Sequence, residues 1–180
     1  MKATGIVRRI DDLGRVVIPK EIRRTMRIRE GDPLEIFTDH EGEVIFKKYS
    51  PIGELAGVAV QYADALNKTC GLAIVVIDRD VVVACAGAPK KEILEHRIST
   101  EIENIIDNRQ LYVWHTDEAK ILVSEKQDKY FVQLAMPIFT EGDVIGAVAV
   151  VGTETMTEPG DTEIKLIQTA SVFLGKQLEA

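Results

Sequence analysis

The sequence predicts an α+β protein of two domains, a small basic domain over residues 1–50 and a larger acidic domain over 51–180. Its 180 residues are enough for one ordinary domain or two small ones. Short strand-like runs around one short helix fill the first fifty residues, whereas longer strands between two helices fill the rest. With 46% hydrophobic and 28% charged residues, the composition is that of a folded chain and excludes disorder.

The first domain has the expected order β-β-α-β-β. Residues 4–10 and 15–18 are predicted as strands on either side of a turn over Asp11–Gly14. Pro19 then begins a short helix, because proline is tolerated at the first helical position. Residues 34–39 and 43–48 are predicted to form a hairpin around the turn 40–42.

A segment this short is not expected to fold alone. The apolar side chains of its hairpin fall on both faces: Leu34, Ile36, Phe37, Val44, Ile45 and Phe46. Below roughly 70 residues a single core is marginal and needs disulfides, a metal or a second chain. The segment has no cysteine and a single histidine, His40. We therefore expect a homodimer that interleaves its strands.

Charge is distributed unevenly along the chain, so the net charge of −7 does not exclude nucleic acid. Residues 1–29 hold nine Lys and Arg against three Asp and Glu, while the remaining 151 residues are strongly acidic. No Phe, Tyr or Trp occurs in residues 1–36, and single-strand and RNA readers rely on aromatic stacking. Duplex DNA is therefore the predicted partner, with a solvated basic face as the alternative.

The strings G-x-V-R, D-x-L-G-R-V-V-I-P and E-I-R-R-T within residues 1–50 resemble the N-terminal module of the AbrB-type transition-state regulators. This resemblance implies a swapped-hairpin β-barrel, formed by a dimer, and developmental control of genes. It also implies DNA contacts by Arg8, Arg15, Arg23 and Arg24, with Arg9 and Lys2 as secondary candidates. Asp11, Asp12, Gly14 and Pro19 are expected to be scaffold for the turn and the helix start.

In the second domain, two helices are expected at the ends of the sequence. Ser50 and Pro51 resemble an N-cap and a first helical residue, Cys70-Gly71 ends that helix, and the last helix follows Pro159-Gly160. Apolar residues recur at heptad-like spacing along both helices and are the predicted oligomer interface, which could make a tetramer: Ile52, Leu55, Ala59, Tyr62, Leu66, Ile164, Ile167, Ser171, Leu174 and Leu178. The alternative is that both helices pack on their own domain.

Between these helices the pattern indicates an antiparallel sheet. Strands are expected over 72–78, 81–87, 111–115 with 119–124 nearby, 129–138 and 144–152, and helices over 90–98 and 100–107. This order resembles the GAF family, whose domains often bind small regulatory molecules. The sequence carries no cyclic-nucleotide or chromophore signature, so a ligand for this domain stays unknown.

Signals for catalysis and for a cofactor are absent from the sequence. No phosphate-binding, dinucleotide, zinc-protease or nucleophile-elbow motif occurs. His40, His96 and His115 are far apart in sequence, and Cys70 and Cys85 are expected to be small hydrophobes rather than catalytic thiols. We therefore expect no enzyme activity, no metal and no cofactor. Two cysteines and no apolar run of about 20 residues indicate a cytoplasmic protein without a membrane span.

The sequence thus predicts an oligomeric, DNA-binding transcription regulator whose second domain serves small-molecule sensing or assembly. Mobile arginines on a symmetric barrel are expected to read groove shape more than a fixed base string. One alternative is an antitoxin-like interaction module that also binds its operator, although antitoxins usually end in an extended tail and here a patterned domain follows. The other is a thiol enzyme that uses Cys70 or Cys85.

Overall fold

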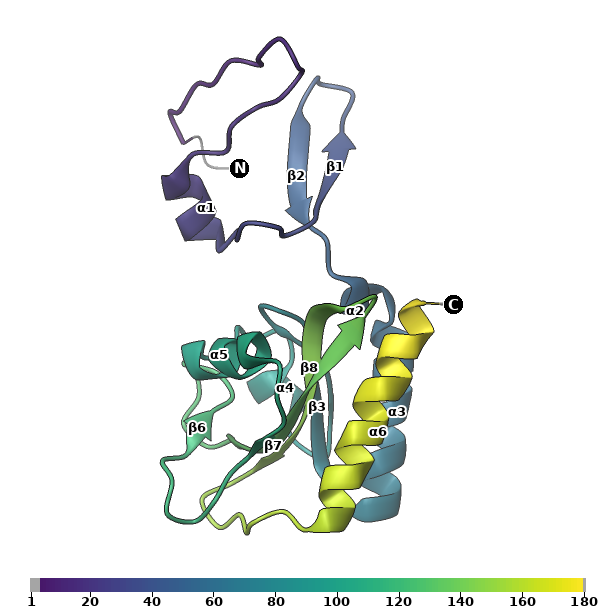
Figure 1. The fold of residues 1–180 in the computed structure, drawn as a ribbon. Coiled ribbons are helices and arrows are strands. Elements are labelled where there is room, and N and C mark those ends of the chain that lie inside the picture. Colours follow the sequence, from purple (N-terminus) through teal and green to yellow (C-terminus); the bar gives the residue numbers. More distant parts are fainter. Residues whose placement is uncertain (1–3, 180) are drawn as a thin grey trace. The chain divides into compact units, whose positions relative to one another are not determined.

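The computed structural model describes residues 4–179 and divides the chain into two compact units, one through Tyr49 and one from Ser50 onward (Figure 1). We call residues 4–49 the head and residues 50–179 the body. Both units are mixed α+β with antiparallel strand pairing. The predicted α+β class is therefore confirmed.

The head contains one short helix and one hairpin. Helix α1 (Lys20–Met26) follows Pro19. Its C-cap is Arg27, whose backbone is left-handed at φ 52°. Strands β1 (Leu34–Thr38) and β2 (Val44–Lys48) pair antiparallel, with Leu34 opposite Lys48. The predicted turn is present as well, because the Gly14 backbone N–H donates to the Asp11 carbonyl at 3.0 Å.

The two other predicted strands of the head, residues 4–10 and 15–18, are irregular in the single chain. The prediction of regular strands there is wrong for one copy, because a strand must exchange backbone hydrogen bonds with a neighbour. At the turn between the two segments, the Asp11 N–H donates to the Arg15 carbonyl at 3.0 Å.

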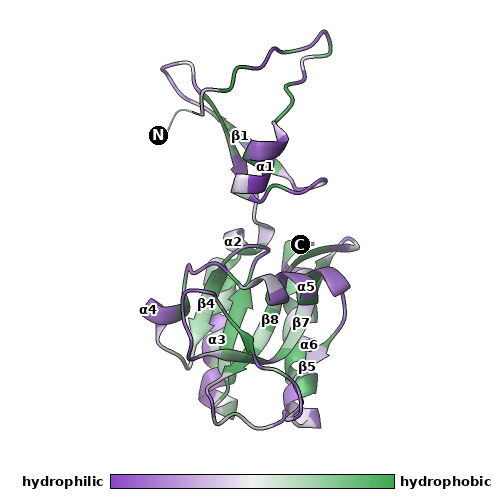
Figure 2. Cartoon of the chain, turned by 90° about the vertical axis from the view of Figure 1, so that its left-hand side faces the viewer, coloured by the Kyte–Doolittle hydropathy of each residue, from purple (hydrophilic) through white to green (hydrophobic). Residues whose placement is uncertain are grey.

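The head leaves most of its apolar side chains in solvent. Pro19 is the one residue among 4–49 that is buried. Val7 is 88% exposed, Ile10 72% and Ile36 61%. Figure 2 shows hydrophobic residues along the extended segments of this unit. A folded unit normally covers such residues, so a single head has no core of its own.

The body is built on one antiparallel sheet with the order β4-β3-β8-β7-β5, in which β6 also pairs with β7. Its centre is a long hairpin of two ten-residue strands, where the Thr140–Asp143 pair adjoins the turn. The strand bounds are β3 (Ala73–Ile77), β4 (Val82–Ala86), β5 (Tyr112–Val113), β6 (Ile121–Leu122), β7 (Phe131–Thr140) and β8 (Asp143–Gly152).

Helices cover both faces of this sheet. On one face lie α3 (Ala56–Cys70) and α6 (Asp161–Leu178), side by side in Figure 1, preceded by the short α2 (Pro51–Glu54). On the other face lie α4 (Lys90–Ile93) and α5 (Thr100–Asn108). An apolar core lies between the sheet and each set of helices, which explains why the central strands are apolar on both faces.

Two glycines allow backbones to approach each other closely in the body. A Cβ on Gly175 of α6 would collide with the Phe139 carbonyl oxygen, and one on Gly146 of β8 would collide with the Ile77 carbonyl oxygen. The last helix therefore lies directly against β7, a contact that only a residue without a side chain permits.

Two predicted helices of the body differ in extent from the structure. The first is interrupted at Leu55, so that residues 51–70 form two helices, α2 and α3. The helix expected over 90–98 ends at Ile93, because Leu94 is extended and Glu95 has a φ of 62°. Among the helices of residues 4–179, none combines the length and apolar character needed to cross a bilayer.

Candidate nucleic-acid interface

The predicted DNA-binding arginines lie in two segments of the head. Arg8 and Arg9 precede the turn at 11–14 and Arg15 follows it, while Arg23 and Arg24 belong to α1. All are exposed except Arg23, which is half-buried. Lys2, the remaining candidate, lies outside the described residues. The two segments therefore present guanidinium groups, the side chains best suited to phosphate oxygens and guanine edges.

Asp11 organises the turn that carries Arg15. Its Oδ1 atom accepts hydrogen bonds from the backbone N–H groups of Leu13, at 3.0 Å, and of Arg15, at 2.8 Å. Its Oδ2 atom accepts from Arg15 Nε at 2.8 Å. The backbone hydrogen bond from Arg15, followed by the side-chain one, lowers the pKa of Asp11 below its usual value. The link between the two side chains is a contact that the sequence pattern did not reveal.

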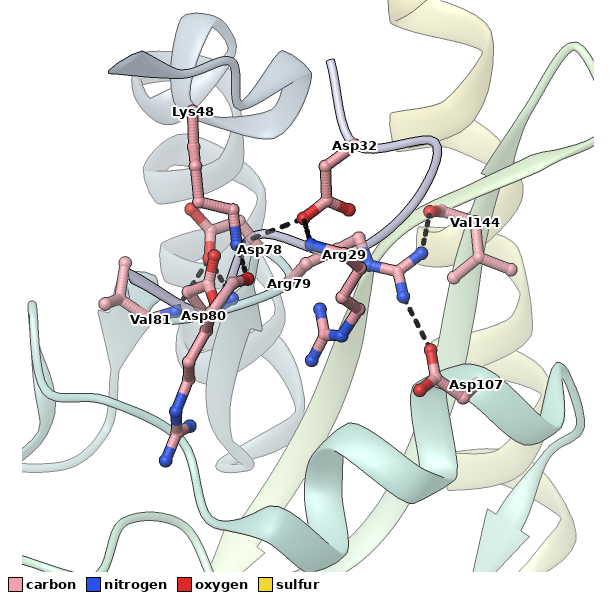
Figure 3. A network of polar contacts seen from close by, with 10 residues as sticks. Arg29, Asp32, Lys48, Asp78, Arg79, Asp80, Val81, Asp107 and Val144 are labelled. Carbon is pink, nitrogen blue, oxygen red and sulfur yellow. Dashed lines mark hydrogen bonds and ion pairs between the residues drawn. The ribbon is translucent and has the colours of Figure 1, made fainter. Parts of the chain in front are cut away.

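A second polar cluster in the head fastens the chain after α1 to the hairpin. Asp32 Oδ2 accepts from the Arg29 backbone N–H at 2.8 Å and lies 3.5 Å from Lys48 Nζ (Figure 3). Lys48 Nζ also donates to the Arg27 carbonyl at 2.9 Å. Lys48, on β2, thus donates a hydrogen bond to the C-cap residue of α1. The position of this arginine-bearing helix therefore depends on β2.

In the body, the turn between β3 and β4 is a centre of polar contacts. Ser50 Oγ accepts from the Gly53 N–H, which confirms the predicted N-cap, and donates to Asp78 Oδ2 at 3.0 Å. Arg79 in the same turn donates to Asp107 Oδ1 at 2.6 Å and to the Val144 carbonyl at 3.3 Å (Figure 3). These bonds tie the first residue of the body and the end of α5 to one end of the sheet, where β3 ends and β8 begins.

The structure revises which side chains of the terminal helices can meet another subunit. Six of the ten predicted interface residues are buried in the core of their own body: Ile52, Ala59, Leu66, Ile167, Ser171 and Leu174. Apolar spacing shows which face of a helix is covered, but it does not show whether the same chain or a partner covers it. These six contacts follow the alternative that both helices pack on their own domain.

The remaining predicted residues, Leu55, Tyr62, Ile164 and Leu178, are half-buried. Apolar side chains also remain on the outer side of α6, where Val172 is 61% exposed and Phe173 37%. The Phe173 ring stacks on Tyr62 of α3 with a centroid distance of 4.9 Å. An outer apolar surface therefore does exist on this helix pair, carried partly by residues that the heptad spacing missed.

Histidines, acids and cysteines are the groups that could suggest catalysis. Within residues 4–179, no three or more His, Cys, Asp and Glu side chains gather as metal ligands. Burial raises the pKa of the Cys85 thiol, which disfavours the nucleophilic thiolate, and Cys70 lies exposed at the end of α3.

Comparisons with known proteins decide the family. The family described as "Stage V sporulation protein T C-terminal, transcription factor" matches residues 54–179. Stage V sporulation protein T of Bacillus subtilis (strain 168) is 50% identical over 179 residues, which cover 99% of each chain. The chain belongs to the stage V sporulation protein T family of transcription factors. The relatives that it matches over most of their length are thus regulators rather than enzymes.

Further matches cover parts of the chain. Transition state regulatory protein AbrB of Bacillus subtilis (strain 168) is 40% identical over 108 residues, which cover 60% of this chain and 96% of AbrB. The family described as "Antidote-toxin recognition MazE, bacterial antitoxin" matches residues 7–53. The GAF domain of a phosphoenolpyruvate-protein phosphotransferase from Coxiella burnetii aligns with a TM-score of 0.52 and 15% identity, over 69% of this chain and 82% of that one. The resemblance to AbrB-type regulators and the GAF-like fold are confirmed.

Proposed function

We propose that this transcription regulator binds double-stranded DNA through the arginines of a dimeric head and that its body joins dimers into a larger assembly. The observation that carries the proposal is the exposed set Arg8, Arg15 and Arg24, in a chain whose family is one of transcription factors. Arginine forks would contact phosphates for position and base edges for selectivity.

Dimerisation of the head is supported by its exposed apolar side chains. Residues 4–49 bury Pro19 alone, and their irregular segments 4–10 and 15–18 have no strand partner among the described residues 4–179. A swapped-hairpin barrel, in which these segments pair with those of a second copy, would cover the apolar residues and supply the missing hydrogen bonds. It would also double the number of arginines on one surface, related by a two-fold axis that suits duplex DNA.

Salt dependence tests the DNA-binding proposal on the full-length protein. Each phosphate neutralised by an arginine releases counterions, so a log–log plot of affinity against salt should fall by about 0.9 per phosphate contacted. Fluorescence anisotropy with a labelled duplex, measured between about 50 and 200 mM salt, should therefore show a loss of affinity of two or more orders of magnitude. An affinity that stays constant over this range would contradict the proposed arginine interface.

Assembly through the body is supported by the outer side of α6. A shallow groove there is lined by Lys165, Gln168, Thr169 and Val172, and Phe173, the next residue along the helix, is 37% exposed. The opposite layer, between the sheet and α5, holds a cluster of the chain's own buried apolar side chains. The exposed apolar side chains of α6 favour a contact with a second body.

Val172→Glu should halve the mass of the full-length assembly measured by light scattering. The added carboxylate would have to leave water at the proposed contact between bodies without a partner, which costs about 1–3 kcal/mol or more. Gln110→Glu is the matched control, since it adds the same charge in the exposed bend after α5. An unchanged mass for Val172→Glu would exclude α6 as the contact between bodies.

The antitoxin alternative has one observation in its favour, the match of residues 7–53 to the MazE family. The remainder of the chain argues against it, because the transcription-factor family covers residues 54–179, which here form a folded domain.

A further inference from the structure

We propose that Asp11 is a positioning residue that holds the Arg15 guanidinium in a fixed orientation and thereby contributes to selectivity among DNA sequences. This proposal rests on the DNA-binding function proposed for the head. It assigns to Asp11 a role beyond the scaffold of the turn, because its carboxylate joins the turn to the arginine side chain.

The Asp11 carboxylate is itself fixed by the backbone. Its Oδ1 atom accepts two N–H groups, from Leu13 at 3.0 Å and Arg15 at 2.8 Å. The main chain of the same turn is closed by hydrogen bonds from the Gly14 N–H to the Asp11 carbonyl and from the Asp11 N–H to the Arg15 carbonyl, both 3.0 Å. With one oxygen held in this way, the direction of Oδ2 is also determined.

The Oδ2 atom of Asp11 in turn binds the Nε side of the Arg15 guanidinium. Arg15 Nε donates to it at 2.8 Å, whereas the Arg15 side chain as a whole remains 69% exposed. A guanidinium has five N–H donors in a planar fork, so four remain on its two terminal nitrogens. This terminal pair can donate to O6 and N7 of a guanine or to two phosphate oxygens. A side chain that is already oriented loses less conformational entropy on binding, and it tolerates misplaced acceptors less well.

The neighbouring charged groups lack this arrangement. Within residues 4–179, Arg8, Arg9 and Arg24 form no ion pair with an acid, and the Asp12 carboxylate accepts no hydrogen bond. Both Asp11 and Asp12 place negative charge beside phosphates, which by itself weakens DNA binding. The two acids therefore carry the same charge in adjacent positions, and only one of them holds an arginine.

This difference supplies a test with a charge-matched control. Asp11→Asn and Asp12→Asn each remove one negative charge from the full-length protein. Asparagine at position 11 keeps an acceptor for the backbone N–H groups, but its other terminal group is an N–H donor and cannot accept from Arg15 Nε. Two duplexes serve as probes: one recovered by the wild-type protein from a randomised pool, and one of random sequence and equal length.

Asp12→Asn should bind both duplexes more tightly, because it removes repulsion alone. Asp11→Asn should bind the selected duplex about two- to fivefold more weakly, the range that loss of an exposed ion pair produces, while it retains or gains affinity for the random duplex. The ratio of the two affinities is thus the decisive measurement. If both variants tighten both duplexes equally, Asp11 does not position Arg15.

Arg15→Lys provides a second test that leaves the turn intact. Lysine keeps the positive charge but offers no planar fork with an Nε donor. Arg15→Lys should lower the same affinity ratio, and adding Asp11→Asn to it should lower the ratio no further. An Arg15→Lys variant with undiminished selectivity would overturn the proposal even if Asp11→Asn misfolds, which circular dichroism would show. Failure of the wild-type protein to bind either duplex would instead overturn the proposed function.

Discussion

Replacing Arg15 and Arg23 together by alanine is expected to weaken duplex DNA binding by about 2–6 kcal/mol. This range follows because an arginine that contacts a base edge contributes about 1–3 kcal/mol, and the two residues lie in different segments of the head. Arg15 is exposed beside the turn at 11–14, and Arg23 is half-buried on α1. This range counts the two arginines of one head, and the loss is larger in the proposed dimer because both copies carry the substitutions.

The loss of affinity should appear in anisotropy titrations at constant salt. A double substitution in the body serves as the control. Lys90 and Lys91 are exposed at the start of α4 and carry the same total charge as the two arginines. Their double replacement by alanine should leave affinity nearly unchanged, since we place the DNA contacts in the head. Equal losses for both double variants would mean that binding responds to net charge alone. Unaltered binding by the arginine variant would remove Arg15 and Arg23 from the interface.

The sequence predicts the body well because its elements are long and contact each other within one chain. The predicted strands 129–138 and 144–152 correspond to β7 and β8, since their apolar runs are rich in β-branched residues and bounded by turn residues. The helix end at Gly71 follows from the strong preference of glycine for the left-handed backbone at a helix C-terminus.

Prediction is weaker where a contact partner decides the structure. Heptad spacing on α3 and α6 identified their apolar faces, but Ile167 and Leu174 contact the sheet of their own body rather than a second copy. The segments 4–10 and 15–18 have strand-forming sequences, yet no strand forms where no neighbour accepts the hydrogen bonds.

Asp11 shows a third kind of difference between pattern and structure. An aspartate four residues before an arginine in a turn predicts local backbone contacts, and these are present. Whether the second carboxylate oxygen also reaches the arginine side chain depends on the turn geometry and on the side-chain conformation. Neither of these is encoded in the spacing alone.

The second large effect is expected from Ile36→Glu, which should abolish both dimerisation of the head and DNA binding. Ile36 is 61% exposed in the single chain and lies opposite Phe46 in the hairpin. If the barrel forms, this side chain becomes part of the shared core, so a carboxylate there would lose its hydration in both copies. An unpaired polar group buried in this way costs about 3 kcal/mol or more, which is large for a small domain.

His40→Glu is the matched control, because it adds the same charge in the exposed turn between β1 and β2. A fragment of residues 1–50 with this change should still sediment as a dimer, whereas the Ile36→Glu fragment should sediment as a monomer.

Unfolding supplies a second measurement. Since folding and association are coupled in a barrel made by two chains, the midpoint of the unfolding transition of the wild-type fragment should rise with protein concentration. A midpoint independent of concentration would show that the head folds alone. The exposed Ile36 would then need another explanation, and DNA binding would survive its replacement. Loss of DNA binding together with the dimer would mean that the arginines of one head do not suffice, because two copies are needed to contact successive turns of the duplex.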